Sequence, residues 1–206
     1  MKIPSTYDLK PAFQRLLTPM MERLRSAGVT PNGLTWTAMV LSAGVGWAFA
    51  QGFDQRWWYW VVVLGLLMRM ALNALDGMMA RRHEMSSPSG AMLNELGDVV
   101  SDALVMWPLA LFAEVSSAWV GAMLWMAAVN ELAGVMGGVV GAGRRYDGPM
   151  GKSDRTLVWG VLCVLLATDV QVEPYLLLGV QAVMVGLVWS TLRRIQHAIS
   201  KPKNHA

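Results

Sequence analysis

Carboxylate and amide side chains interrupt two neighbouring apolar stretches at helical spacing. Asn73 and Asp76 lie three residues apart in one stretch, and Asn94, Asp98 and Asp102 follow at intervals of four in the next. Residues three or four apart share one face of a helix, so each set can gather its oxygens. Converging carboxylate and amide oxygens suit a hard divalent cation such as Mg²⁺ or Mn²⁺. The spacing therefore predicts a metal site, which would suit a diphosphate attached to a lipid.

Three more ionisable residues, Arg69, Glu95 and Glu131, also lie within apolar stretches. Charged groups in such stretches are costly and are functional candidates by default. Helix packing with buried ion pairs is the alternative for the whole array, and the regular spacing argues against it. For Arg69, Asp102 and Glu131 a structural charge cluster explains the residues at least as well as catalysis, because buried charges need partners.

The composition indicates a membrane protein. Of 206 residues, 54% are hydrophobic and 15% are charged, whereas about a quarter of a soluble domain is charged. Most of six apolar stretches approach the ~20 residues that a helix needs to cross a bilayer. We predict an all-α polytopic membrane protein with six transmembrane helices, in one domain over 1–206 with the bundle over 30–197. The stretches are 34–51, 57–80, 91–113, 117–142, 156–170 and 174–195.

The segment 6–27 precedes these stretches and predicts an amphipathic helix on the membrane surface. Its apolar residues recur at helical spacing, and basic residues lie among them, as is typical of interfacial helices. The apolar residues are Phe13, Leu16, Leu17, Met20, Met21 and Leu24.

Basic residues predict the orientation in the membrane. All of the 17 Lys and Arg residues except Arg56 and Arg69 fall at the termini or in the connectors after the second and fourth stretches. The positive-inside rule then places both termini in the cytoplasm, and we expect the bacterial inner membrane. The short polar connector 81–89 predicts that the second and third spans are antiparallel neighbours. Basic clusters between apolar stretches also argue against a nucleic-acid partner.

The stretch 73–102 resembles the signature of class I CDP-alcohol phosphatidyltransferases, D-x-x-D-G-x-x-A-R followed eight residues later by G-x-x-x-D-x-x-x-D. The step Thr30-Pro31-Asn32 is similar to the family's entry into its first span, and six spans after an amphipathic helix agree with the family fold. The residues in register with the signature are Asp76, Gly77, Ala80, Arg81, Gly90 and Asp98.

The resemblance implies transfer of a phosphatidyl group from CDP-diacylglycerol to a small alcohol, with release of CMP. It implies metal ligands at Asn73, Asp76, Asn94 and Asp98, which we call the motif residues, and a general base at Asp98. It also implies a homodimer among membrane lipids. The residues expected to contact the CDP-lipid are Asn32, Gly77, Ala80, Arg81 and Gly90.

Two motif residues depart from the family pattern, because Asn73 and Asn94 replace its first and third aspartates. An amide oxygen can coordinate a metal but brings no charge. With two carboxylates, the site can bind one metal, can bind two only with the diphosphate present, or can gain charge from Asp102. We favour the second arrangement for an enzyme. Loss of catalysis is the fourth alternative.

The connector 143–155 carries four basic residues, and it loosely resembles the acceptor-phosphate segment of inositol-phosphate-using members. We predict that Lys152, Arg155 and Arg144 contact a phosphate on the acceptor alcohol, since arginine binds phosphate in a bidentate manner. Glycerol 3-phosphate is the first candidate acceptor and a polyol phosphate such as inositol phosphate the second. A topology signal explains the same charges about equally well.

Two other functions compete with a phosphatidyltransferase. Asn73 and Asn94 support a pseudoenzyme that binds CDP-lipid or regulates lipid synthesis. A small cation or proton transporter would need access from both sides of the membrane, and the acidic motif residues gather toward one. The residues that it could use are Asp76, Asp98, Asp102 and Glu131.

Overall fold

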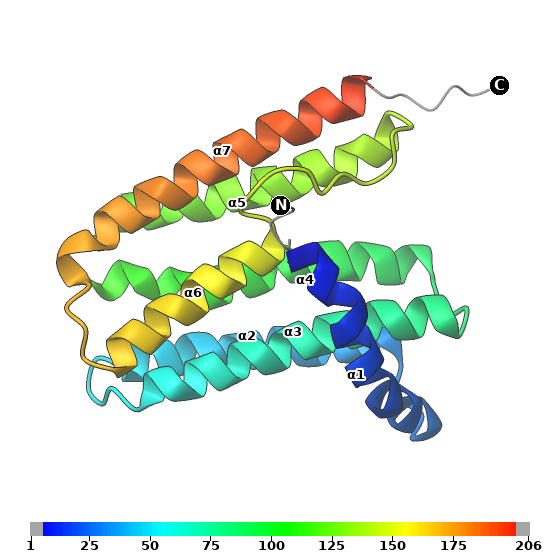
Figure 1. The fold of residues 1–206 in the computed structure, drawn as a ribbon, viewed down its shortest axis with the longest axis horizontal. Helices are drawn as coiled ribbons and strands as arrows, with labels where there is room; N and C mark the ends of the chain where they lie inside the picture. Colours follow the sequence, from blue (N-terminus) through cyan, green and yellow to red (C-terminus); the bar gives the residue numbers. More distant parts are fainter. Residues whose placement is uncertain (1–5, 201–206) are drawn as a thin grey trace.

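The computed structural model describes residues 6–200, and every regular element in that range is helical (Figure 1). This confirms the all-α prediction. The long helices are α1 (Thr6–Ser26), α2 (Pro31–Gln51), α3 (Trp58–Arg82), α4 (Pro88–Met106), α5 (Ser117–Val139), α6 (Lys152–Ala167) and α7 (Leu176–Ser200). Two short 3₁₀ helices, η1 (Trp107–Leu111) and η2 (Glu173–Tyr175), join α4 to α5 and α6 to α7.

Four helical segments are long and apolar enough to cross a membrane: α2, α3, α5 and the segment Glu173–Ser200 that contains α7. The other two members of the bundle fall short for different reasons. α4 carries Glu95, Asp98 and Asp102 within 19 residues, and α6 is only 16 residues long. Sequence composition alone therefore establishes a membrane bundle with four clear spans.

The predicted third stretch, 91–113, is wrong as a single α-helix. In the structure α4 ends at Met106, and the chain continues as η1. Pro108 explains the change, because proline has no backbone N–H to donate and its ring crowds the preceding turn. The apolar run continues through this break, so hydropathy could not reveal it.

α2 is the central helix of the first half of the chain and packs against both α3 and α4. The prediction that the second and third spans are antiparallel neighbours holds in part: α3 and α4 run antiparallel (Figure 1), and their side chains meet at Arg69 and Asp102, but they do not form a closely packed pair. Glycine permits the close packing of α2 against α4 at two positions. A β-carbon on Gly46 would collide with the backbone carbonyl oxygen of Leu104, and a β-carbon on Gly97 would lie 3.1 Å from Met39 Sδ.

We expect Gly46→Ala to destabilise the bundle by about 1–3 kcal/mol, because the added methyl group meets α4 backbone that cannot move aside. Gly44→Ala is the matched control: it lies in the same helix, and nothing lies within 4 Å of the added carbon. The control should be neutral or should gain about 0.5–1 kcal/mol from helix propensity. Unfolding of both variants in detergent measures the difference, and equal stabilities would contradict the close approach of α2 and α4.

α1 covers one end of the α2–α3 pair. Leu17 and Met21 are buried against Leu34, Leu75 and Met79. Two other members of the predicted apolar stripe face outward, because Leu16 is 75% exposed and Met20 is 42% exposed. One side of α1 therefore packs on the bundle, and apolar side chains remain on the other side.

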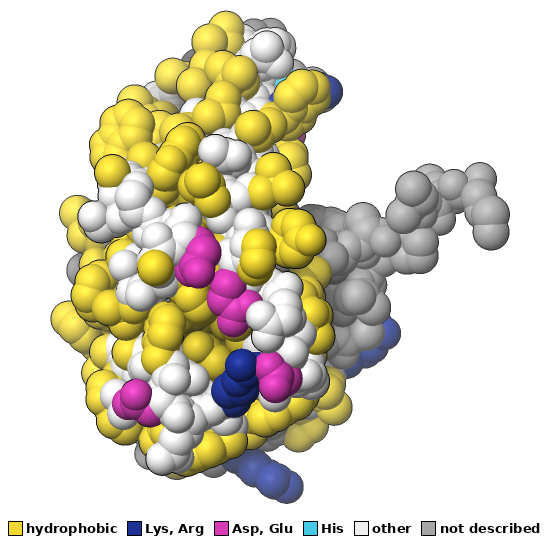
Figure 2. Space-filling view, turned by 90° about the vertical axis from the view of Figure 1, so that its left-hand side faces the viewer, with side chains coloured by type: hydrophobic (Ala, Val, Ile, Leu, Met, Phe, Trp, Pro, Cys, Tyr) yellow, Lys and Arg dark blue, Asp and Glu magenta, His cyan; other side chains and the backbone are white. Residues whose placement is uncertain are grey.

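The two ends of the bundle differ in charge. The α3–α4 and α5–α6 connectors lie at one end, and the α2–α3, η1–α5 and α6–α7 connectors lie at the other (Figure 1). Figure 2 looks onto the second end, where a few charged side chains lie among hydrophobic ones. Its connectors contain one basic residue, Arg56, which forms an exposed ion pair with Asp169.

Candidate active site

Thr35 of α2 links the two motif helices. Its hydroxyl donates a hydrogen bond of 3.0 Å to Asp76 Oδ2 on α3. Its methyl carbon lies 3.2 Å from the position that a β-carbon on Gly97 of α4 would take. Gly97 precedes Asp98, and both Asp76 and Asp98 are buried. The two carboxylates that the motif retains are thus linked through Thr35 of α2.

Lys152 supplies a positive charge to this region. Its ammonium forms an ion pair with Asp98, across the space between the start of α6 and the middle of α4. Sequence analysis anticipated Asp98 and Lys152 separately, and the fold pairs them.

Two helices begin side by side at the motif end of the bundle. α2 starts at Thr30-Pro31 and α4 starts at Ser87-Pro88, and in each case the hydroxyl of the first residue accepts a hydrogen bond from a glycine N–H in the first turn. A proline at the first helical position and a Ser or Thr cap favour such a start. The starts touch, because a β-carbon on Gly90 would lie 2.7 Å from Asn32 Oδ1. Exposed N–H groups and the helix dipole favour an anion there.

The remaining predicted site residues lie around these starts. Arg81 is exposed at the end of α3, and its Nη1 lies 3.2 Å from the position of a β-carbon on Gly77. Ala80, Asn73 and Asn94 are half-buried. A larger side chain at position 77 would push Arg81 aside, so the glycine leaves room for that guanidinium.

Deeper in the bundle, a set of buried charged side chains joins five helices. Arg69 on α3 donates to Asp102 on α4 at 2.6 Å, and Arg155 on α6 donates to the other oxygen of Asp102 at 2.5 Å. Arg155 also donates to Glu131 on α5 at 2.9 Å, and Arg194 on α7 lies 3.6 Å from Glu131. We call these five residues the ionic layer. Both oxygens of Asp102 are occupied by arginines, which leaves this residue poorly placed to add charge to a metal site.

The ionic layer is placed by the same helical spacing as the motif. Arg155 lies one turn after Lys152 in α6, and Asp102 lies one turn after Asp98 in α4. The two ion pairs therefore stack, and the buried pair fixes how far α6 slides along α4. Arg144, in the connector before α6, pairs with Glu95 and lies 3.3 Å from Glu131. Arg155 is thus engaged within the protein, whereas Lys152 and Arg144 each keep 25% of their side-chain surface exposed.

The connector 140–151 folds back along α5 and α7, so that α6 starts partway along the bundle (Figure 1). Asp147 accepts two hydrogen bonds from Arg145, at 2.8 and 2.9 Å, and lies 2.7 Å from His197 Nδ1 on α7. Ser190 of α7 donates to the backbone carbonyl of Asp147 at 2.9 Å. These contacts hold the connector that delivers Lys152. The sequence offered no signal for them, because Asp147 and His197 lie far apart in the chain.

The hydrogen bonds to Asp147 predict a loss of stability in acid. Burial alone would raise the pKa of Asp147, but hydrogen bonds from His197 and Arg145 outweigh it and hold that pKa below its usual value. The ionised carboxylate therefore stabilises the fold above the unfolded pKa of ~3.9, and this contribution disappears as the pH falls through the lower folded pKa. Comparing thermal unfolding of wild type and Asp147→Asn, we expect their difference to shrink below about pH 4. A difference that stays constant in acid would contradict the role of the carboxylate.

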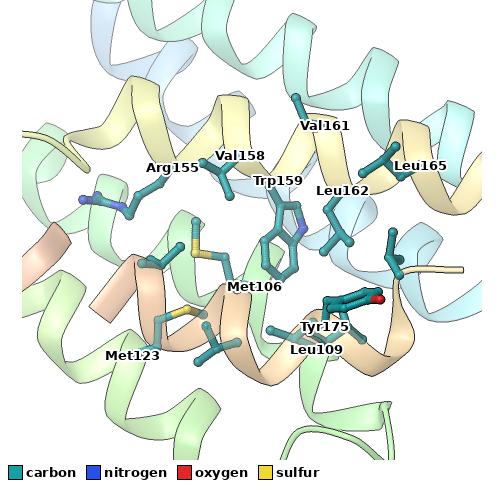
Figure 3. A pocket seen from close by; sticks show the side chains of 15 residues that line it. Met106, Leu109, Met123, Arg155, Val158, Trp159, Val161, Leu162, Leu165 and Tyr175 are labelled. Carbon is teal, nitrogen blue, oxygen red and sulfur yellow. The ribbon is translucent and has the colours of Figure 1, made fainter. Parts of the chain in front are cut away.

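The structure also contains an apolar cavity of about 220 Å³ between α6 and α7 (Figure 3). Met106, Leu109, Trp159 and Tyr175 are among its lining residues. Arg155 borders it at one end, but its guanidinium points away toward the ionic layer (Figure 3). The cavity contains no motif residue, so it is separate from the candidate active site.

Thr35 is the site residue that sequence reasoning missed. It stands three residues after Asn32, one turn into α2, and it looks like an ordinary polar residue in an apolar span. Its contact with Asp76 depends on α2 lying between the motif helices. A hydroxyl that shares the helix face of Asn32 was the available signal.

The sequence matches the family model described as CDP-alcohol phosphatidyltransferase over residues 28–192. The chain belongs to the CDP-alcohol phosphatidyltransferase family. The match includes the motif residues, Lys152 and the start of α2. Family membership confirms the predicted class of activity, a membrane phosphatidyltransferase of phospholipid biosynthesis.

Two relatives in this family come from Escherichia coli (strain K12). Inner membrane protein YnbA is 34% identical over 195 residues, which is 94% of this chain and 96% of the relative. Inner membrane protein YnjF is 30% identical over 122 residues, which is 59% of this chain and 56% of the relative. Together with the four apolar helices, these relatives support an integral membrane protein.

The fold also matches solved structures of Mycobacterium tuberculosis phosphatidylinositol phosphate synthase (PgsA1). The structure with CDP-DAG bound has a TM-score of 0.74 at 20% identity and covers 93% of this chain and 98% of that chain. The structure in complex with manganese and citrate has a TM-score of 0.73 at 20% identity, covering 92% and 91%. At this level of identity the likeness establishes that the two proteins share the family fold.

Proposed function

We propose that this protein transfers the phosphatidyl group of CDP-diacylglycerol to a small phosphorylated alcohol and releases CMP. The observation that carries this proposal is that Thr35, one turn into α2, hydrogen-bonds Asp76 on α3 and packs against Gly97, which precedes Asp98 on α4. Carboxylates next to helix N-termini suit a metal-bound diphosphate. The structure of PgsA1 with CDP-DAG bound, which shares the fold, supports a CDP-lipid as donor.

The motif residues fit a divalent cation by the chemistry of their donors. Asp76 and Asp98 offer carboxylate oxygens and Asn73 and Asn94 offer amide oxygens, the ligands that Mg²⁺ and Mn²⁺ prefer. Within residues 6–200 no three acidic, His or Cys side chains gather to form a ligand set, so the amides would have to complete it. A bound cation would polarise the diphosphate and stabilise CMP as the leaving group. The manganese complex of PgsA1 supports a divalent metal without deciding between the two ions.

In this proposal the side chains of the protein position the substrates and move one proton. The amide of Asn32 and the free N–H groups of α2 and α4 orient the diphosphate, with Gly90 admitting the Asn32 amide and Gly77 admitting the Arg81 guanidinium. Asp98 takes the proton from the acceptor hydroxyl. The acceptor oxygen then bonds to the β-phosphorus, and the bond from that phosphorus to the CMP oxygen breaks.

The acceptor is proposed to approach from the α5–α6 connector. Lys152 and Arg144 are partly exposed there and can reach an anionic group. Arg155 is buried against Asp102 and Glu131, so we assign it a supporting role behind these two residues. A basic pair suits glycerol 3-phosphate or a polyol phosphate better than a neutral alcohol.

We also propose that α4 and α6 cross the membrane with the other four helices. Their outward side chains are apolar: Leu96 is 62% exposed and Leu157 is 58% exposed. Their charges point inward, to the motif residues and the ionic layer. The basic end of the bundle then faces the cytoplasm of a bacterial cell, and α1 lies at that surface with Leu16 toward the lipid. The homodimer implied by the family stays a prediction.

The proposal is tested by incubating the purified protein in detergent with CDP-diacylglycerol, Mn²⁺ and a panel of alcohols. CMP release is expected with a phosphorylated acceptor and not with serine or water alone. Chelation of the metal should abolish the release. Good binding of CDP-lipid without CMP release for any acceptor would overturn the proposal and favour a CDP-lipid-binding pseudoenzyme.

A further inference from the structure

Lys152 is the first residue of α6, and its ammonium lies against one of the two carboxylates that the motif retains. The Asp98 side chain is 8% exposed, and the Lys152 ammonium donates a hydrogen bond to its Oδ1. A bound cation would have to displace Lys152 to reach the same oxygen. The side chain of Lys152 thus stands where a positive ion would otherwise bind Asp98.

The pairing is imposed by the fold around it. Arg155 grips Asp102 through two nitrogen atoms, at 2.9 and 2.5 Å, one turn below the pair of Lys152 and Asp98. Arg155 also donates to the carbonyl oxygen of Met150 at 2.8 Å, which ties down the chain just before α6. Lys152 therefore starts a helix that is anchored on both sides. Its pairing with Asp98 follows from the register of α6 on α4.

The charges at the site count against two divalent cations. Asp76 and Asp98 contribute two negative charges, Lys152 contributes one positive charge, and the two asparagines contribute none. Without substrate, one divalent cation changes the resulting single negative charge into a single positive charge, whereas two would leave three positive charges in a partly buried site. Such an excess is costly where water is scarce. A bound diphosphate would offset part of this excess, and in that state the inference depends on the Lys152 ammonium, which already occupies one oxygen of Asp98.

We propose that the Lys152 ammonium takes the place of a second metal ion, so that the site holds one divalent cation near Asp76 whether or not CDP-lipid is bound. The inference rests on the proposed function, since the metal and the diphosphate belong to it. It departs from the arrangement of two ions that assemble only with the diphosphate. Asn94 lies one turn before Asp98 on α4, and its neutral amide fits a site to which Lys152 already supplies a positive charge.

The test counts Mn²⁺ ions bound to the full-length protein in detergent, by equilibrium dialysis and electron paramagnetic resonance, with and without CDP-diacylglycerol. Wild type is expected to bind one Mn²⁺ per chain in both conditions. Lys152→Gln, which removes the charge at similar length, should bind a second ion once CDP-diacylglycerol is present. Lys152→Arg keeps the charge and should stay at one ion. Arg56→Gln, at the opposite end of the bundle, is the matched control and should also stay at one.

Two results would overturn the inference. Wild type that binds two ions per chain would show that Lys152 replaces no metal, while CMP release would leave the proposed function standing. Lys152→Gln that stays folded and still binds one ion with CDP-diacylglycerol would show the same. Failure of the proposed function looks different, because it would appear as no CMP release from wild type whatever the number of ions bound.

Discussion

Asp98→Asn is expected to lower the rate of CMP release by about 10²–10⁴-fold, the usual contribution of a general base. Asp98 is the buried motif carboxylate on α4, and in the proposed reaction it removes the proton of the acceptor hydroxyl. Asparagine has nearly the same shape and can still offer an oxygen to a metal. It cannot accept a proton at neutral pH. The loss should therefore fall on turnover more than on binding of CDP-diacylglycerol.

The measurement is CMP release at saturating donor, together with CDP-diacylglycerol binding for each variant. Asp54→Asn is the matched control, since it makes the same chemical change at an exposed position at the other end of the bundle. The control should keep wild-type activity. If Asp98→Asn retained more than about a tenth of the wild-type rate, Asp98 would not be the base.

Asp102→Asn is expected to lower the free energy of unfolding by about 3–5 kcal/mol, the usual cost of breaking a buried ion pair. Asp102 accepts from Arg69 with one oxygen and from Arg155 with the other, and all three side chains are buried. A neutral amide would leave the two buried guanidinium groups without a compensating carboxylate, in a place where water cannot solvate them. Three helices would lose their common contact in one substitution.

Unfolding of the purified protein in detergent by a chemical denaturant measures this effect. The matched control is Arg56→Gln, which breaks an ion pair whose partners are 49% and 68% exposed. Exposed pairs contribute only about 0–1 kcal/mol, so the control should change little. If the two variants lost similar amounts of unfolding free energy, the ionic layer would contribute no more to stability than an exposed ion pair.

Much of the candidate site could be predicted from the sequence because it depends on local spacing. Two pairs of motif residues share a helix face whatever the rest of the fold does: Asn73 with Asp76, and Asn94 with Asp98. The starts of α2 and α4 are likewise indicated by a Ser or Thr before proline. The family signature follows the same spacing. Apolar periodicity also gave the helices, except where Pro108 ends α4 inside an unbroken apolar run.

The parts that could not be predicted depend on contacts between distant segments. No local sequence signal places α2 between the motif helices. That position depends on two close approaches that glycine permits: Gly46 of α2 lies against the α4 backbone, and Gly97 of α4 lies against α2 side chains. The role of Thr35 follows from it. In the sequence Arg155 belongs to a basic cluster and therefore resembles a phosphate ligand. The fold shows instead that its guanidinium pairs with Asp102 and Glu131.

The ionic layer bears on whether ions can leak across the membrane through this protein. A polar site open at the basic end of the bundle creates a wet recess within the bilayer, and a continuous polar path from it to the other side would leak ions. The fixed positive charges of Arg69, Arg155 and Arg194 lie across the bundle below the site, with their apolar neighbours beyond. These three arginines face the two carboxylates of Asp102 and Glu131, so the layer keeps a net positive charge, and positive charge in a narrow passage repels cations. We therefore expect the ionic layer to hinder ion leakage through the recess, which argues against a cation transporter.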